Sequence, residues 1–499
     1  MSSSAAPAPR LITANRSQVI LATVDVEKLI AEDHPARAIW EFVGHLDLES
    51  YRLAIKSLEG GAGRPAYDPR LLISIWILAT SMGEGSAREI ERLCSHHPAF
   101  QWLAGMQEIN HHTLSDFRVD HKETLDELFT QILGLLSAEN LITLERVTQD
   151  GTKIKACASL DSFRSEGKLR THLEAARTQV SAMGDPRESS DKKRAAAQAR
   201  ALQDRRERLE KALEELPRVR ERKKTKEARQ DARVSETDPE ARIMIFSGGG
   251  FAPSYHVQLS VDAAHDIIVN VDVSEIGTDT DLLTGPMKQV EERMGKKPAQ
   301  VVADGGYTNN VNILAMADAE IDFYGSITDA TRIVDAGYAR RGIAPEFRNE
   351  AFRYAEATDK YVCPAGHKLH LIHRYNKRPG SSHHLYQAKA EICAACPHLA
   401  QCFPGMKKHG REVTRTITHP LVAAFHEKME TAEAKAIYRS RGQTAEFPNA
   451  WIKAKFGLRQ FRTRGKANTK QEALWASITY NVQQWIRLIW RPKLAHSCG

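Results

Sequence analysis

The fold is decided by residues 299–307, AQVVADGGY. A short apolar run ends here in Asp304 and two glycines, a pattern typical of a buried strand that leads into a loop. A carboxylate at the end of such a strand costs desolvation free energy unless a positive partner meets it. The carboxyl edge of parallel strands is also where α/β proteins bind ligands. Asp304 is therefore a candidate site residue.

A second acidic strand lies upstream, in residues 145–156, ERVTQDGTKIKA. Its alternation and Gly151 predict a strand or a hairpin, with Asp150 near the end of the first strand. Aspartates on neighbouring strands would converge, and such a pair of anions attracts a divalent cation. Each aspartate taken alone also fits a surface residue before a turn glycine.

The segments around these two acids predict an α/β layer. Residues 255–274 favour two strands joined by a turn at Ala264–Asp266. Residues 279–295 and 311–321 favour helices, and residues 322–327 a further strand. An antiparallel hairpin beside parallel strands gives a mixed sheet.

A third carboxylate should come from a helix laid against the strand ends, and residues 438–453 offer one. Glu446 and Lys453 are seven residues apart and share a helix face, and a kink could bring Arg441 to the same side. Pro448 would bend or end many helices. The alternative is a salt-bridged surface helix. The competing acids are Glu427, Glu430, Glu433 and Glu472.

A basic loop, LRQFRTRGKANTK, follows at residues 458–470. Its cations, with Phe461 interleaved, fit a track for DNA, and a basic surface loop is the alternative. The cations are Arg459, Arg462, Arg464 and Lys466.

The chain from Val24 to about Phe129 has a helical pattern. Ser86 with Glu89 predicts a capping box, and Thr113 predicts the cap of a later helix. Short helices joined by glycine-containing turns fit a helix-turn-helix, and an all-helical packing domain is the alternative. The candidates for facing DNA are Arg88, Arg92, Arg118 and Lys122.

Two stretches interrupt the strand pattern. Residues 165–242 are rich in Ala, Arg, Lys, Glu and Leu and predict a charged helical insertion, with a solvated surface or a nucleic-acid contact as its role. Residues 329–431 contain most of the cysteines. Their CxxC spacing favours a closed, structural zinc site, and reduced, partly buried cysteines are the alternative. The candidate ligands are Cys363, Cys393, Cys396 and Cys402, with His367, His370 and His398 as substitutes.

The composition, with 42% hydrophobic and 27% charged residues, is that of a globular chain. The length of 499 residues indicates roughly two to four domains. A net charge of +7 permits a nucleic-acid partner without requiring one. No apolar run reaches the roughly 18 residues of a membrane helix, and the N-terminus has no secretory pattern. We therefore expect a cytoplasmic protein with no membrane partner.

Together these segments resemble the DDE transposases of bacterial insertion sequences, and more narrowly the subgroup with a Tyr-Arg-Glu-Lys signature. Residues 148–156 and 301–307 are similar to the two aspartate blocks, and residues 64–94 and 111–118 to the N-terminal domain. The Cys-rich segments are similar too, so the resemblance spans about residues 15–490. The signature matches Tyr438, Arg441, Glu446 and Lys453.

The resemblance implies a ribonuclease-H-like α/β mixed sheet with a helical insertion and a Cys-rich insertion, preceded by an all-α domain. The expected parts are a flexible lead (1–20), a helical DNA-binding domain (21–140), a catalytic core (141–164 and 243–328), a charged insertion (165–242), a Cys-rich insertion with a zinc site (329–431) and the glutamate-bearing end of the core (432–495).

The implied activity is metal-dependent cleavage of DNA at transposon ends, followed by 3′-hydroxyl strand transfer into target DNA. Asp150, Asp304 and Glu446 would hold Mg²⁺ or Mn²⁺, and Arg441 and Lys453 would hold phosphates. Tyr438 would position DNA backbone or a flipped base. The resemblance also implies a homodimer on the DNA ends and association with the bacterial nucleoid.

Two other classes compete with this interpretation. A catalytically inactive, transposase-derived DNA-binding protein would keep the N-terminal helices and lose a carboxylate, whereas all three are present. A zinc-dependent hydrolase would more often carry a His-rich motif such as HExxH, which the sequence lacks.

Overall fold

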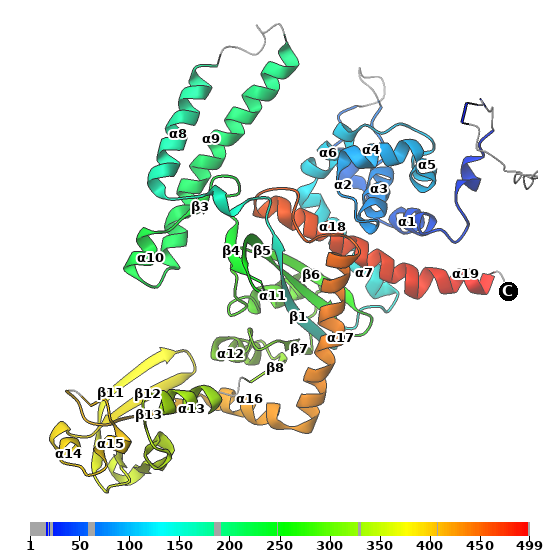
Figure 1. The fold of residues 1–499 in the computed structure, drawn as a ribbon. Coiled ribbons are helices and arrows are strands. Elements are labelled where there is room, and N and C mark those ends of the chain that lie inside the picture. The colour runs from blue at the N-terminus through cyan, green and yellow to red at the C-terminus, as the bar shows by residue number, and fades with distance from the viewer. Residues whose placement is uncertain are drawn as a thin grey trace, which may run out of the picture.

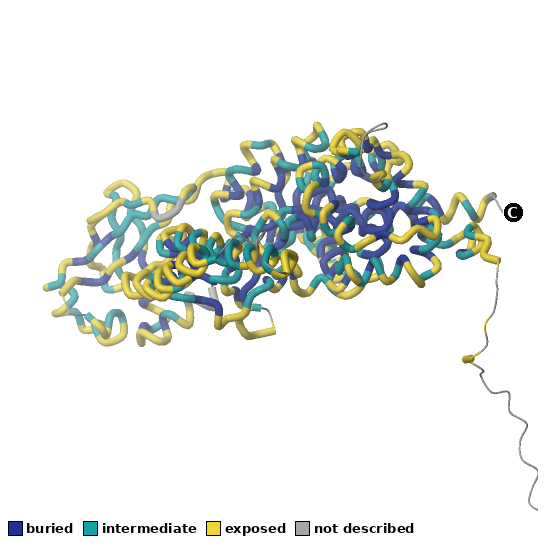
Figure 2. Tube along the Cα trace, turned by 90° about the horizontal axis from the view of Figure 1, so that it is seen from above, coloured by how far each residue is buried: buried dark blue, intermediate teal, exposed yellow. Residues whose placement is uncertain are grey.

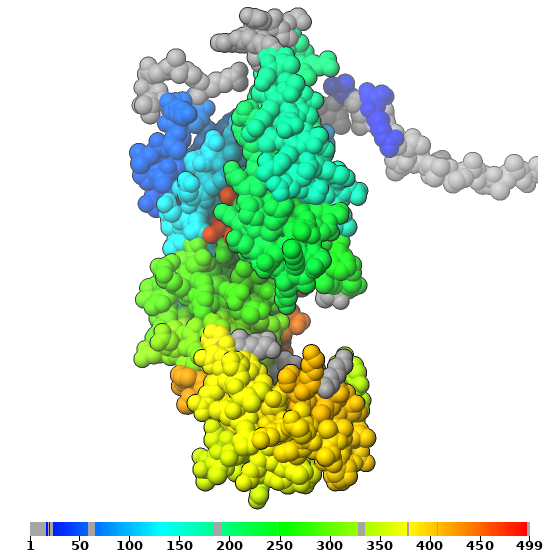
Figure 3. Space-filling model, turned by 90° about the vertical axis from the view of Figure 1, so that its left-hand side faces the viewer, coloured from blue at the N-terminus to red at the C-terminus, as the bar shows by residue number. Residues whose placement is uncertain are grey.

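The computed structural model describes residues 16, 17, 19, 23–57, 65–183, 191–246, 248–327, 331–406 and 408–497. Most of the predicted flexible lead, residues 1–20, lies outside these ranges. The described chain forms a central sheet with helices packed beside it. A helical hairpin and a small second sheet project from opposite ends (Figures 1 and 3).

The central sheet has six strands and is mixed, as the sequence predicts. β1 runs antiparallel to β5 and parallel to β7, while β6 pairs with β5 and β8 with β7. The turn between β5 and β6 contains Ala264–Asp266, as predicted. The strands are β1 (Arg146–Lys155), β4 (Arg242–Ile245), β5 (Phe251–Asp262), β6 (Ile267–Ser274), β7 (Gln300–Ala303) and β8 (Asp322–Gly325).

Of the two alternatives predicted for residues 145–156, a strand or a hairpin, the structure has the strand, which is uninterrupted, but Asp150 does not lie near its end. Gly151 pairs with Gln258 inside the ladder, and Asp150 lies in the middle of the strand. With β5 on one side and β7 on the other, β1 bonds to both neighbours. These ladder hydrogen bonds outweigh the turn tendency of a single glycine.

Helices precede the sheet, as the sequence predicts. Ser86 caps its helix by accepting a hydrogen bond from Glu89 N, as expected. The later cap is Asn110 and not Thr113, because α6 begins at His111 and Asn110 accepts from His112 N. The helices are α1 (Pro35–Gly44), α2 (Glu49–Leu53), α3 (Pro69–Ser81), α4 (Ala87–His96), α5 (Pro98–Ala104), α6 (His111–Asp120) and α7 (Lys122–Ala138), after a 3₁₀ turn at Val26–Leu29.

Two C-terminal helices join these parts. α17 (Ala432–Ala454) contacts β1, β5, β7 and β8, and Pro448 lies inside it without ending it. α18 (Lys466–Trp485) contacts α3, α7 and β6 and continues through a π-helical turn, Ile486–Trp490, into α19 (Arg491–Ser497). The remaining helices beside the sheet are α11 (Thr284–Met294), α12 (Asn310–Asp318) and α16 (Pro420–Glu430).

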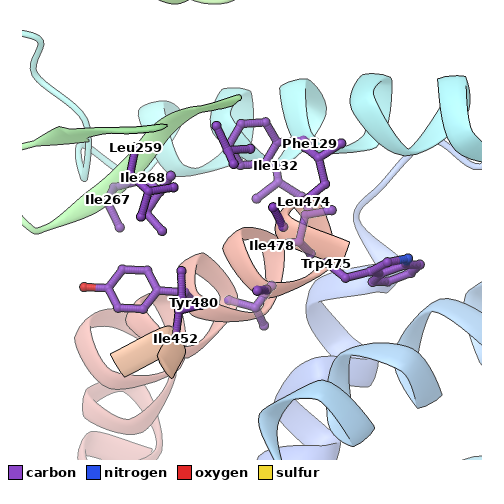
Figure 4. Close-up of a cluster of buried hydrophobic side chains, with 14 of the residues drawn as sticks. Phe129, Ile132, Leu259, Ile267, Ile268, Ile452, Leu474, Trp475, Ile478 and Tyr480 are labelled. Carbon is purple, nitrogen blue, oxygen red and sulfur yellow. The ribbon is translucent and has the colours of Figure 1, made fainter. Parts of the chain in front are cut away.

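The core lies where α7, α18 and the sheet meet (Figure 4). Phe129, Ile268 and Ile478 are each fully buried there. Removing each such side chain from water contributes about 1.5–3 kcal/mol. Buried residues gather in this region, while the hairpin and the small second sheet are mostly exposed or half-buried (Figure 2).

The hairpin lies within residues 165–242, the stretch for which the sequence predicts a charged helical insertion. It consists of α8 (Glu166–Ser181) and α9 (Lys192–Glu221), and its own apolar cluster includes Leu169, Leu209 and Leu216. α10 (Lys226–Gln230) and the short pair β2 (Phe163–Arg164) and β3 (Val234–Ser235) lie at its base.

The Cys-rich stretch contains a five-stranded antiparallel sheet. We call residues 345–418 the cysteine lobe. Its strands are β9 (Arg353–Ala355), β10 (Lys360–Val362), β11 (Lys368–Arg378), β12 (Ser381–Gln387) and β13 (Glu412–Thr418), with helices α14 (Ala390–Ala394) and α15 (Leu399–Cys402), and α13 (Thr331–Arg340) leads into it.

Candidate active site

Asp150 lies in β1, and Asp304 directly follows β7, the strand that runs parallel beside it. Gln149 of β1 pairs with Ala303 of β7. The residue after Gln149 is Asp150, and the residue after Ala303 is Asp304. Asp304 follows the last residue of β7, and its Oδ1 accepts a hydrogen bond of 2.7 Å from Gly306 N. The two aspartates therefore lie at the same edge of adjacent parallel strands.

α17 brings polar side chains to Asp150. Asn449 Nδ2 donates a 2.9 Å hydrogen bond to Asp150 Oδ2, and Arg441 Nη1 lies 3.9 Å from Asp150 Oδ1. Asn449 is only 7% exposed, and its Oδ1 has no hydrogen-bond partner among the described residues. The sequence analysis did not single out Asn449.

Burial dominates the electrostatics at Asp150. It raises the pKa of this carboxyl to about 6; the positive charge of Arg441 opposes the shift, and the negative charges of Asp304 and Asp279 add to it. Burial also lowers the pKa of Lys453, while the charge of Asp150 opposes that shift. The site is thus a partly desolvated set of carboxylates flanked by two cations from one helix.

Asp279 is a third aspartate at this site, and the sequence analysis missed it. The sequence pattern predicts that a helix starts at residue 279, but α11 begins at Thr284 and Asp279 lies in the preceding loop. A Cβ atom at Gly306 would lie 2.9 Å from Asp279 Oδ2 and 3.0 Å from Asp304 Oδ1. Both carboxylates therefore border the same small space.

A polar network on β5 holds Asp279. His256 Nε2 lies 3.4 Å from Asp279 Oδ1, and Gln258 Nε2 donates to the same oxygen at 3.5 Å. Gln258 also accepts hydrogen bonds from Gln149 and from the buried Tyr307. Burial lowers the pKa of His256, and the charge of Asp279 opposes this shift.

Glu446 lies on the same helix but is exposed. It is one turn before Asn449, so the two residues share a helix face. No group of three or more His, Cys, Asp or Glu side chains within the described ranges is close enough to hold a metal ion. In this arrangement Asn449, and not Glu446, contacts Asp150.

The rest of the predicted signature surrounds this contact. Tyr438 is half-buried, and its ring centroid lies 5.8 Å from Arg441 Cζ. Tyr438, Arg441 and Lys453 thus follow one another along α17 over the edge of the sheet.

The basic loop after α17 is partly fixed to other elements. Arg462 Nη1 lies 2.7 Å from Glu84 Oε1, and Lys466 Nζ lies 3.1 Å from Glu275 Oε2. Arg459 and Arg464 are exposed. Phe461 is buried with its ring 6.0 Å from that of Tyr255, so it belongs to the core.

One of the four N-terminal cations packs against its own domain. Arg118 lies over the Trp76 ring at 4.9 Å and donates to Gly85 O at 3.0 Å. Burial lowers the pKa of Arg118. This guanidinium contributes to packing, whereas Arg88, Arg92 and Lys122 are exposed or half-buried.

The four clustered cysteines line one pocket of the cysteine lobe, together with His367 and His398. All four are free thiols and half-buried. Burial raises the pKa of Cys402, and Arg411 opposes this shift. The sulfurs come from two segments far apart in the chain, since Cys363 follows β10 and the others lie on or beside α14 and α15.

Two family models match the chain. The one described as Transposase DDE domain matches residues 362–486, and the one described as Transposase domain (DUF772) matches residues 24–120. Both matches are to transposase domains, and together they support a DDE transposase of the insertion-sequence type. Neither the curated proteins nor the solved structures contain a match.

The matched ranges cover the helical N-terminal part of the transposase, most of the cysteine lobe, α17 and α18. Asp150, Asp279 and Asp304 lie outside them. Such transposases act on DNA and in general use divalent metal ions. Within the described part of the transposase, no helix combines the length and apolar character that crossing a bilayer requires.

Proposed function

We propose that this transposase cleaves DNA at the ends of its transposon and transfers the new 3′-hydroxyl into target DNA, using Asp150, Asp304 and Glu446. The observation that carries the proposal is the position of Asp150 in β1 and of Asp304 directly after the adjacent parallel strand β7, with α17 packed against both strands. The strand order around β1, antiparallel on one side and parallel on the other, supports a ribonuclease-H-like core.

The donor set fits a hard divalent cation. Carboxylate and amide oxygens are ligands that Mg²⁺ prefers. The buried Asn449 Oδ1 accepts no hydrogen bond within the described residues, so it is available as a ligand. Asp150, Asp304 and Glu446 would hold the metal, which when bound polarises the scissile phosphate and activates the attacking hydroxyl. Glu446 shares a helix face with Asn449, and its side chain would turn toward the aspartates when the metal binds.

The cations of α17 have a separate role. Arg441 and Lys453 flank the carboxylates and would hold the phosphates on either side of the scissile bond, and Tyr438 would position the backbone or a flipped base. Arg459 and Arg464 would contact DNA further along. Arg462 and Lys466 would exchange carboxylate partners for phosphate when DNA binds.

Cys363, Cys393, Cys396 and Cys402 would hold a structural Zn²⁺. Their convergence on one pocket supports this assignment, because four thiolates suit a closed tetrahedral site. The zinc would stabilise the cysteine lobe and take no part in the chemistry. On DNA we expect two copies of the chain, one for each end of the element.

The test uses duplex DNA that carries the terminal repeats flanking this gene, with Mg²⁺. The wild type should nick the repeat ends and join them to a second duplex. Asp304→Ala and Glu446→Gln should reduce both products by at least about a hundredfold, because each removes a metal-holding carboxylate. Glu427→Gln, on an exposed face of α16, should leave both products unchanged.

Two results would contradict the proposal. Wild-type protein that binds the repeats but never cleaves them would favour the inactive DNA-binding alternative. Full activity of Asp304→Ala would show that Asp304 is not part of the active site.

A further inference from the structure

We propose that the α8–α9 hairpin is a DNA-binding arm, and that Arg205 and Arg208 of α9, together with Arg464 of the basic loop, hold the phosphate backbone of the transposon-end duplex. This inference rests on the proposed function, because the duplex that it names is the one to be cleaved beside Asp150. Neither matched family range contains the hairpin.

Two carboxylates attach the base of the hairpin to the basic loop. Glu240 Oε2 lies 2.9 Å from Lys211 Nζ of α9 and accepts a hydrogen bond of 2.9 Å from Lys466 N. Glu275 Oε2 lies 3.1 Å from Lys466 Nζ, and Glu275 Oε1 lies 3.4 Å from Arg222 Nη2, directly after α9. The start of α18 therefore lies at the base of the hairpin (Figure 1).

This attachment brings three guanidinium groups together, at Arg205, Arg208 and Arg464. Burial lowers the pKa of Arg208, the charge of Arg464 lowers it further, and Asp204 opposes the shift. The buried Nε of Arg208 donates no hydrogen bond within the described residues, and Arg205 donates to a neutral amide of α8. Within the described residues, none of the three forms an ion pair with a carboxylate. Like charges this close repel one another, so an anion placed among them would be stabilised.

The charges of α9 are divided between its two halves. Residues 192–208 carry seven basic side chains and two acidic ones, whereas residues 209–221 carry three basic and four acidic ones. Acids of the second half have basic partners: Glu215 pairs with Arg242, and Glu210 pairs with an arginine of α8. A solvated helix usually mixes its charges along its length, so the basic first half favours a polyanionic partner.

The basic loop continues this surface toward the candidate active site. Lys155 N of β1 donates to Arg459 O at 3.2 Å, and the side chain of Arg459 is exposed. Burial lowers the pKa of Lys453; the charge of Asp150 opposes this shift, and the charge of Arg459 adds to it. Cations therefore lie at intervals from Asp150 through the basic loop to α9.

The extent of this surface fits duplex DNA. A duplex carries about one negative charge per 1.7 Å of its axis, so its phosphates can meet cations along the whole run. Residues 192–208 alone extend about 25 Å, which is the length of about seven base pairs. The duplex that reaches Asp150 is therefore the partner that can also contact the hairpin.

The experiment measures binding of the full-length protein, in EDTA, to a duplex that carries the terminal repeat, over a series of salt concentrations. Arg205→Gln combined with Arg208→Gln should weaken binding about tenfold or more at physiological salt. It should also reduce the slope of log affinity against log salt by about two, because two phosphate contacts are lost. Arg170→Gln combined with Arg218→Gln is the matched control. It removes two charges that pair with glutamates at the base of the hairpin, and it should bind as the wild type does.

A second pair of changes avoids the half-buried Arg208. Arg194→Gln combined with Arg200→Gln alters two exposed side chains of α9, so the fold should be unaffected, and the salt slope should fall in the same direction. Hydroxyl-radical footprinting locates the contact. Both hairpin variants should lose protection of the repeat backbone away from the cleavage position and keep it beside that position.

Three results would overturn the role of the hairpin. The first is an unchanged salt slope and footprint in both hairpin variants. The second is an equal loss of binding in the control variant. The third is weaker binding to a repeat-free duplex with an unchanged footprint on the repeat, which would assign the hairpin to target DNA. None of these measurements needs cleavage, so a wild type that gives the footprint but never cleaves with Mg²⁺ would overturn the proposed function alone.

Discussion

Asp150 carries opposing influences within one side chain. Its burial favours the neutral carboxyl, while Arg441 and the hydrogen bond from Asn449 favour the charged form. Burial prevails, so the pKa is raised to about 6. Without a metal ion, the ionised carboxylate of Asp150 therefore lowers the stability of the folded protein at neutral pH.

The first prediction concerns this cost. With a folded-state pKa above the unfolded value, Asp150 binds its proton more tightly in the folded protein, so its contribution to stability falls as the pH rises from about 4 through about 6. Asp150→Asn in EDTA should therefore be more stable than the wild type at pH 8, by about 3 kcal/mol at most. The difference should shrink as the pH is lowered, as thermal melts across this range will reveal. A gain that persists unchanged at pH 4 would contradict the assignment.

At this scale the sequence predicts some site residues and misses others. Asp150 and Asp304 are predictable because each interrupts an apolar strand pattern, where a carboxylate rarely stands without a ligand or a positive partner. Asp279 and Asn449 are not, because one stands in a polar loop and the other on a polar helix, where such residues are common. Only the tertiary contacts give these two a role, and periodicity carries no information on contacts between distant segments.

The α8–α9 hairpin and the cysteine lobe each have a separate apolar cluster, and the two clusters differ in size. The hairpin of α8 and α9 has a small apolar cluster of its own. The cysteine lobe has an even smaller core, with Leu369, Tyr386 and Val413 among its few buried apolar residues. A sheet with so small a core needs an additional constraint, which the proposed zinc site would provide.

The second prediction follows from this. Cys396→Ser removes one proposed ligand, so it should abolish stoichiometric zinc and open the cysteine lobe to proteolysis within residues 345–418, while the central sheet resists. Metal analysis and limited proteolysis will measure the two effects. Cys157→Ser, outside the pocket, is the control. Equal protease resistance of the wild type and Cys396→Ser would count against a structural metal.

Sequence patterns also predict elements unevenly. The β5–β6 pair and α3 are predictable from alternation and from a long apolar run. The continuity of β1 through Gly151 is not, because it depends on partner strands that are remote in sequence. The same holds for the five strands of the cysteine lobe, whose largely polar segments bury only a few apolar residues.

In the whole molecule, α18 is shared by the N-terminal helices and the sheet. Trp475 packs its ring 6.0 Å from that of Trp76 in α3, while Asn481 accepts a hydrogen bond from Ile268 N in β6. The buried residues of both parts form one continuous cluster. The DNA-binding and catalytic parts that the sequence suggests are therefore joined by a common core.

The third prediction tests this joint core. Trp475→Ala should cost about 3–5 kcal/mol and lower the melting of the helical part and the sheet together, since both lose the same contact. Leu53→Ala, at a side chain that is 77% exposed, should change stability by less than about 0.5 kcal/mol. Calorimetry of the two variants provides the measurement. Separate transitions in Trp475→Ala, with the sheet unaffected, would show that the two parts are independent.

The end of β1 has one more neighbour. Lys155 N donates to Arg459 O at 3.2 Å, and Phe461 N donates to Lys155 O at 2.8 Å. Residues 459–461, which include the exposed Arg459, are thus hydrogen-bonded to the end of β1, the strand that contains Asp150. Any shift of this segment must either break these two hydrogen bonds or displace β1. A load on the exposed cations would therefore be passed through the backbone of β1 to Asp150.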